Sequence, residues 1–197
     1  VPARSGGARA WSFVGFGAVA PPARGERGAL TAGRLLADRF ALAPLPASAR
    51  ELAAAAAHLP PPARVELDAA ATEAELRRRA AEGTRVLHFA THAVVVERLA
   101  PGAAVFLSPA DGDDGLLTAA EIAAQPLGAD LAVLAACRSA VGSAADGRAL
   151  SSLTGAFLAA GANGVVASLW EVGDAATAAF MEQFYFELAR GVRPAAA

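Results

Sequence analysis

Two residues that could act together in nucleophilic catalysis each follow an apolar stretch of the chain. Cys137, the single cysteine among 197 residues, ends the run "ADLAVLAAC" at residues 129–137. His92 closes "VLHFATH", 45 positions earlier. An imidazole can take the proton of a neighbouring thiol and later pass it to a leaving amine, and the resulting thiolate is the stronger nucleophile. His92 and Cys137 are therefore candidates for a His/Cys dyad, provided that the fold brings them together.

The surrounding pattern predicts elements that would place both residues at one edge of a sheet. Strands are expected where apolar, aromatic and β-branched residues run together, at 11–17, 63–68, 85–96, 103–109, 129–137 and 164–170. Helical stretches separate most of these runs, so we expect an α/β domain with a largely parallel central sheet. In such a sheet, catalytic groups gather at the carboxyl ends of the strands, which is where His92 and Cys137 would lie.

Four of the expected helices begin at a residue whose side chain can cap the first turn. These residues are Ser48, Thr72, Thr118 and Asp174. The first three are each followed by a glutamate three positions later, which is the spacing of a capping box. A further helix is expected within 149–162, closed near Gly161.

Simpler interpretations exist for the same residues. A lone cysteine at the end of an apolar run is often only a small buried side chain. His88 lies four positions before His92, on the same face if the strand alternates regularly, and we expect it to be a hydrogen-bonded structural residue. Three scattered histidines and one cysteine do not have zinc-ligand spacing, and no P-loop, GxGxxG or GxSxG motif is present, so no metal or cofactor is expected.

Composition sets the broad class of the protein. The chain is 55% hydrophobic, enough for one well-packed domain, and carries 17 basic and 19 acidic residues. Without a clustered basic face, nucleic-acid contact is not expected. A single cysteine, the lack of an apolar leader and the short apolar runs predict a cytoplasmic protein without membrane contact. All basic residues are arginine, which indicates a GC-rich, bacterial genome, and the missing initial Met suggests a piece of a longer chain.

Four blocks of sequence carry a resemblance to a known family. They are "RVLHFATHA", "DGLLTAAEI", "ADLAVLAAC" and "GAFLAAGANGVVASLWEVGDAATAAFMEQFY". In order and spacing they resemble CHAT domains, the bacterial caspase-like peptidase domains often fused to tetratricopeptide repeats. The separation of His92 and Cys137 is also close to the roughly 50 residues found in caspases. The resemblance spans residues 11–192, with a flexible lead-in expected at 1–10 and a tail at 193–197.

The resemblance implies a three-layer, caspase-haemoglobinase-like α/β fold whose largely parallel central sheet is flanked by helices. It also implies cysteine endopeptidase activity with His92 and Cys137 as the dyad. The backbone N–H groups of Ala93 and Cys137 would then be the oxyanion donors. The expected partner is a protein or peptide substrate in regulated bacterial defence or signalling, with a sensor or tetratricopeptide-repeat module outside this stretch.

Three departures from the family leave an alternative open. Ala93 stands where the family usually has Gly, which would strain the backbone if a positive φ were needed there. "RSA" follows Cys137 in place of commoner residues, and the closing helix and strand of the family are not found, so we expect a C-terminal truncation. The alternative is a catalytically inactive CHAT pseudo-peptidase that serves as an interaction module.

Two further features could contribute to a substrate pocket. The turn "ADGDDG" contains Asp111, Asp113 and Asp114, which could select a basic substrate residue but could equally form a solvated turn. Arg138 directly follows the nucleophile and could either favour its thiolate or point to solvent.

Overall fold

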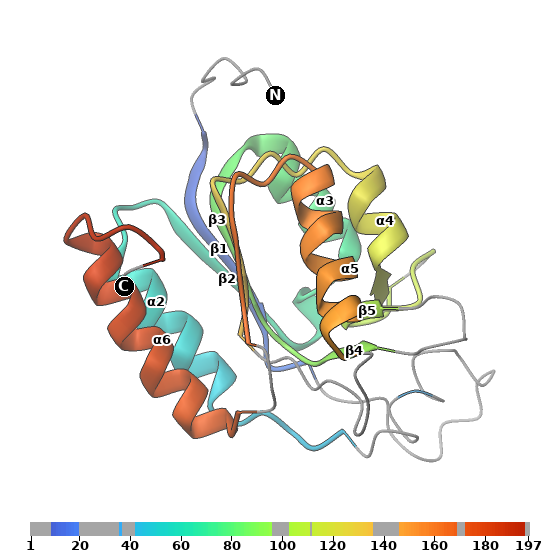
Figure 1. Ribbon diagram of the computed structural model, residues 1–197, viewed down its shortest axis with the longest axis horizontal. Coiled ribbons are helices and arrows are strands. Elements are labelled where there is room, and N and C mark those ends of the chain that lie inside the picture. Colours follow the sequence, from blue (N-terminus) through green and yellow to red (C-terminus); the bar gives the residue numbers. More distant parts are fainter. Residues whose placement is uncertain are drawn as a thin grey trace.

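The apolar runs of the sequence form the inner strands of a five-stranded parallel sheet (Figure 1). The computed structural model describes residues 9–19, 36, 42–95, 103–110, 112–135, 146–168 and 172–195. The strands, in spatial order, are β2 (Ala63–Leu67), β1 (Trp11–Gly17), β3 (Thr84–Ala90), β7 (Leu131–Leu134) and β8 (Val165–Ala167). All four pairings between them are parallel, so their carboxyl ends share one edge, as predicted.

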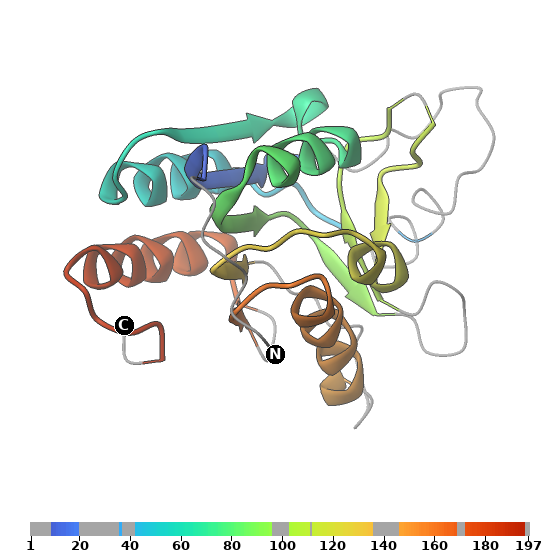
Figure 2. The same cartoon turned by 90° about the horizontal axis from the view of Figure 1, so that it is seen from above.

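Helices cover both faces of this sheet (Figures 1 and 2). One face carries α2 (Ser48–His58) and α6 (Asp174–Ala189), whose Leu52 and Phe184 enter a core with Phe13 of β1. The other face carries α3 (Glu73–Glu82), α4 (Ala119–Ala124) and α5 (Asp146–Ala159), which share a second core with the sheet. The predicted class, an α/β fold with a parallel central sheet flanked by helices, is confirmed.

Two glycines in β1 allow α2 to lie close against the sheet. A Cβ added to Gly15 or to Gly17 would come within 2.6 Å of the Leu52 side chain. Leu52 is fully buried at this contact. The close approach of α2 therefore explains why small residues interrupt an otherwise apolar and aromatic strand.

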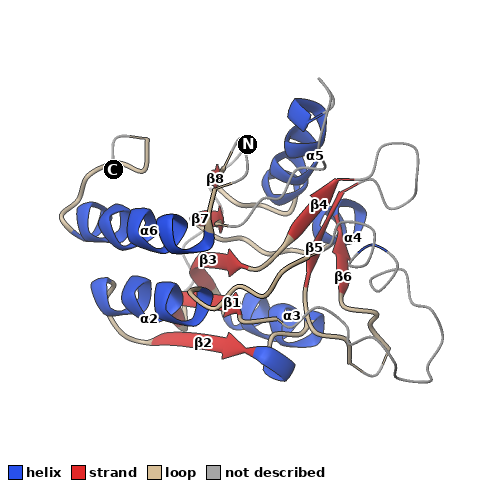
Figure 3. Cartoon of the chain, turned by 90° about the horizontal axis from the view of Figure 1, so that it is seen from below, coloured by secondary structure: helices blue, strands red, loops and turns tan. Residues whose placement is uncertain are grey.

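The apolar stretch at 85–96 was predicted as one strand, and this prediction is wrong. β3 ends at Ala90, and the chain enters a second sheet as β4 (Ala93–Val95). β4 pairs antiparallel with β5 (Ala103–Phe106), which pairs in turn with β6 (Leu116–Thr118). Figure 3 shows β3 leading through a short connection into β4. His92 lies in this connection, so alternation along a single strand does not determine its orientation.

The predicted helix caps divide into two groups. Thr72 accepts from the Glu75 N–H at 3.1 Å, and Thr118 forms a full capping box with Glu121, as predicted. Ser48 and Asp174 do not cap their own helices, because each is the first helical residue and has a distant partner. Ser48 accepts from the Ala18 N–H, and Asp174 accepts from the Ala47 N–H.

The strand β8 is only partly buried. Its three residues are all partly exposed, whereas every residue of β7 is buried. Among the described strands, β8 pairs only with β7, so one of its edges receives no strand from the described part of the chain. Of the described helices, none combines the length and the apolar character needed to cross a bilayer.

Candidate active site at the carboxyl edge of the sheet

His92 lies at the carboxyl edge of the central sheet, between β3 and β4. The residue is buried, with 6% of its surface exposed, and its backbone carbonyl accepts from the Phe106 N–H at 2.8 Å. Its ring nitrogen Nε2 lies 2.7 Å from the carbonyl oxygen of Ala43. Because a carbonyl only accepts, Nε2 must carry the hydrogen in this bond.

This hydrogen bond fixes the tautomer of the His92 ring. When neutral imidazole carries its hydrogen on Nε2, Nδ1 is the nitrogen that can accept a proton. The Ala43 carbonyl therefore selects the basic atom and holds the plane of the ring. In the serine-protease triad, a buried carboxylate gives the same support to the catalytic histidine.

The register of β3 and β7 relates His92 to the segment that leads to Cys137. Phe89 of β3 pairs with Leu134 of β7, and the Ala135 N–H donates to the Phe89 carbonyl at 3.0 Å. His92 lies three residues beyond Phe89, and Cys137 lies three residues beyond Leu134. Cys137 and Arg138 are outside the described residues, so the predicted dyad and the predicted Cys137 donor stay predictions.

Ala93 has a backbone that suits its side chain. It begins the extended strand β4, and only Ala18 and Asp68 among the described non-glycine residues have a positive φ. The Phe106 to His92 hydrogen bond makes Ala93 and Val105 a non-hydrogen-bonded pair of the antiparallel ladder. The Ala93 N–H therefore points away from β5. The strain anticipated for Ala in place of Gly is absent.

His88 belongs to a buried network on the face of the sheet that α2 and α6 cover. Its Nε2–H donates to Oε1 of Glu51 at 2.8 Å, and Nδ1 accepts from the Tyr185 hydroxyl at 2.9 Å. The three side chains are at most 2% exposed, and burial, together with the negative charge of Glu51, raises the pKa of Tyr185 well above its usual value. The expectation that His88 is a hydrogen-bonded structural residue is confirmed. The network joins β3 to α2 and α6.

The role of Glu51 was not predicted, because its spacing from Ser48 suggested a capping box. A different signal was present in the same helix. Positions 48, 51, 52 and 55 form one buried stripe of α2. A glutamate in such a stripe needs a buried partner, and His88 was available.

The acidic turn contacts α3 and its own backbone. Asp113 forms an ion pair with Arg77, and Asp114 accepts from the Leu116 N–H at 2.9 Å. Asp111 lies outside the described residues. The described contacts are those of a structured turn, and a role of the three aspartates in substrate selection stays a prediction.

A comparison with protein-family models matches the CHAT domain over residues 12–197. The chain belongs to the CHAT domain family. A comparison with curated proteins found no match. The family places this chain among caspase-like, peptidase-related domains, in agreement with the parallel sheet and its helical layers.

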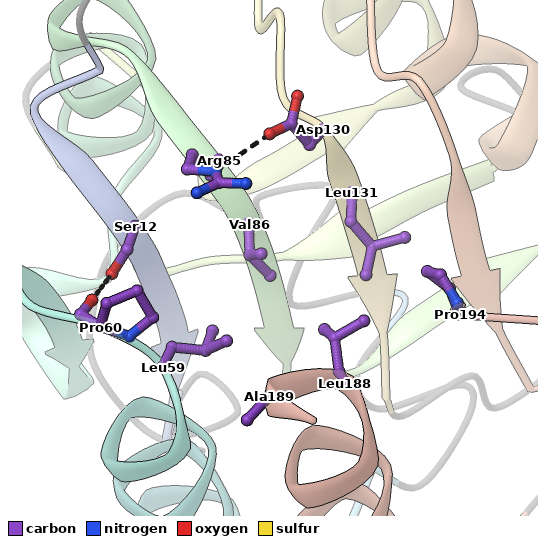
Figure 4. Close-up of a pocket in the computed structure, with 10 residues that line it drawn as sticks. All are labelled: Ser12, Leu59, Pro60, Arg85, Val86, Asp130, Leu131, Leu188, Ala189 and Pro194. Carbon is purple, nitrogen blue, oxygen red and sulfur yellow. Dashed lines mark hydrogen bonds and ion pairs between the residues drawn. The ribbon is translucent and has the colours of Figure 1, made fainter. Parts of the chain in front are cut away.

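A cavity of about 310 Å³ opens at the other edge of the CHAT domain's sheet (Figure 4). Residues at the starts of β1, β3 and β7 line it, together with the ends of α2 and α6. Arg85 and Asp130 form its charged wall, with 3.2 Å between Nε and Oδ2. His92 follows the opposite end of β3, so this cavity is separate from the candidate dyad. Within the described part of the chain, no three His, Cys, Asp or Glu residues gather as a metal site would require.

Proposed function

We propose that this CHAT domain is a cysteine endopeptidase in which Cys137 is the nucleophile and His92 the general base and acid. The observation that carries the proposal is the hydrogen bond from His92 to Ala43, which orients a buried imidazole at the carboxyl edge of the sheet. The pairing of Phe89 with Leu134 supports it, because His92 and Cys137 each lie three positions further along the chain from this pair. Adjacent strands lie about 4.8 Å apart at such a pair, so the two segments that carry the proposed dyad start from neighbouring points of the sheet.

In the proposed reaction, Nδ1 of His92 takes the thiol proton of Cys137. The thiolate attacks the scissile carbonyl carbon, and the backbone N–H groups of Ala93 and Cys137 donate to the oxyanion that develops. The carbon–nitrogen bond breaks as the imidazolium passes its proton to the leaving amine. Water, deprotonated by His92, then attacks the thioester, releases the carboxylic acid and restores the thiol.

The alternative of an inactive pseudo-peptidase loses one of its supports. One of its sequence arguments was that Ala93 would strain the backbone if a positive φ were needed there. Ala93 instead lies in ordinary extended backbone with its N–H directed away from β5. A peptidyl acyloxymethyl ketone distinguishes the two functions, because it labels an activated Cys137 and leaves an inert thiol unmodified.

The proposal is tested by profiling a peptide library with the wild type beside Cys137→Ala and His92→Gln. Both variants should lose detectable cleavage, since each removes a group that makes or breaks bonds. His58→Ala is the matched control for the loss of a histidine, because His58 is the last residue of α2 and its ring contacts Phe186 of α6. Cleavage that persists in Cys137→Ala, or that is equally lost in His58→Ala, would overturn the proposal.

A further inference from the structure

The carboxylate of Asp174 reaches from α6 to the start of α2. Its Oδ2 accepts from the Ala47 N–H at 2.7 Å, across 127 positions of sequence. Ala47 immediately precedes α2, where backbone N–H groups have no partner within the helix. In Figure 1 the starts of α2 and α6 lie side by side. Asp174 therefore supplies an acceptor to a helix other than its own.

Residues 42–48, which we call the anchor segment, are held at three further points. The Ser48 hydroxyl donates to the Leu45 carbonyl at 2.9 Å and accepts from the Ala18 N–H at the same distance. Ala18 directly follows β1, so this contact ties the segment to the carboxyl edge of the sheet. The Ala43 carbonyl accepts from His92. The segment thus connects Asp174 at one end to His92 near the other.

We propose that Asp174 is a positioning residue for His92, acting through the anchor segment. By holding the Ala47 N–H, Asp174 restricts the backbone of the segment and fixes where the Ala43 carbonyl lies. That carbonyl sets the ring plane and tautomer of His92 and stabilises the imidazolium that forms during the reaction. The proposal rests on the function proposed above, because only then does the orientation of His92 control a rate.

Two substitutions of Asp174 can separate the effect of its hydrogen bond from the effect of its charge. Asp174→Ala removes the acceptor oxygen, whereas Asp174→Asn keeps an acceptor at the same reach. Both substitutions remove the negative charge from the first turn of α6, so any helix-dipole effect is common to the two variants. The difference in activity between Asp174→Ala and Asp174→Asn therefore reports the contribution of the hydrogen bond to Ala47.

The experiment measures kcat, KM and the pH–rate profile of peptide cleavage for both variants. For Asp174→Ala, kcat should fall about 5- to 30-fold with KM nearly unchanged, and the limb that reports the imidazolium should move to lower pH. Asp174→Asn should remain close to the wild type. Glu182→Ala, an exposed carboxylate further along α6, is the control and should change neither quantity.

Ser48→Ala provides a second perturbation if Asp174→Ala does not fold. It weakens the same segment from the β1 side and should shift the same limb of the profile in the same direction. An Asp174→Ala or Ser48→Ala protein that melts at a lower temperature but keeps the wild-type pH profile would overturn the proposal. So would an Asp174→Asn protein as impaired as Asp174→Ala, since charge rather than the hydrogen bond would then matter.

A readout independent of cleavage separates this proposal from the proposed function. The ring protons of His92, assigned by comparison with His92→Gln, are titrated by NMR in each variant. A midpoint displaced in Asp174→Ala and restored in Asp174→Asn supports positioning even if Cys137→Ala retains cleavage and the peptidase assignment fails. An unmoved midpoint refutes positioning even if the dyad is confirmed.

Discussion

Glu73 is a buried acid that should lose its proton as pH rises. This loss should lower the stability of the folded protein. It begins α3, and its side chain is 3% exposed. Burial raises its pKa from 4.5 to about 7, and the negative charges of Asp113, Glu121 and Asp114 add to the effect. Arg77, 3.6 Å away, acts in the opposite direction. Glu73 is thus surrounded by more negative than positive charge.

The sign of the pH dependence follows from the direction of this shift. Between 4.5 and about 7, the folded protein keeps a proton on Glu73 that the unfolded chain has lost. The stabilisation is complete below 4.5 and disappears as pH rises through about 7. The full shift corresponds to about 3 kcal/mol, and screening of the surrounding charges by solvent reduces the expected contribution to about 1–2 kcal/mol.

Glu73→Gln removes this titration while keeping the size of the side chain. Urea unfolding from about pH 5 to about pH 8 should show the variant gaining about 1–2 kcal/mol in free energy of unfolding relative to the wild type as pH rises. Glu187→Gln is the control and should follow the wild type, because Glu187 accepts from Gln183 in an exposed hydrogen bond within α6. If the difference between Glu73→Gln and the wild type is constant or falls with pH, the protonated state assigned to Glu73 is wrong.

Three further predictions concern other parts of the fold. Glu51→Ala leaves His88 buried without its carboxylate, so urea unfolding should show a loss of about 3 kcal/mol; a loss below about 1 kcal/mol would contradict the importance of the pair. The pKa of Glu75 is lowered to about 2, chiefly by its hydrogen bond to Arg78, so its stabilisation is present above 4.5 and lost as pH falls toward 2. Glu75→Gln should therefore cost about 1 kcal/mol at neutral pH and nothing in acid, and a cost independent of pH would disagree. Ala93→Gly should keep kcat/KM for the proposed peptide cleavage within about twofold of the wild type, because the backbone needs no glycine there. A large gain would show that Ala93 impairs the candidate site.

The fold was predictable from the sequence wherever local chemistry decides the structure. The apolar run that forms β7 can be buried only between two layers, and Thr72 and Thr118 cap helices through residues three positions away. The division of 85–96 into β3 and β4 was not predictable, because no glycine or proline marks the break after Ala90. The break is set instead by pairing with other strands: β3 pairs with β1 and β7, whereas β4 pairs with β5.

For the candidate site, the sequence nominates His92 and Cys137 as reactive groups, which stay predictions, but not the groups that support His92. Histidine and cysteine are identified by residue type, and their order matches a family pattern. The Ala43 carbonyl that orients His92 is a backbone group, which every residue carries, so no residue type identifies it. Asp174 was predicted to cap its own helix, and its actual partner, Ala47, follows only from the packing of α6 beside α2.

Helix α2 links the stability of the sheet to the geometry of the candidate site. Glu51, inside the helix, holds His88 on β3, while the anchor segment before the helix holds His92 just beyond the same strand. A displacement of α2 would therefore move the support of both histidines together. Separating the buried pair of Glu51 and His88 would be costly, so this contact opposes a displacement of α2. A carbonyl in a loose loop would orient an imidazole poorly, so in the proposed dyad this attachment would let the Ala43 carbonyl orient His92 without a third side chain.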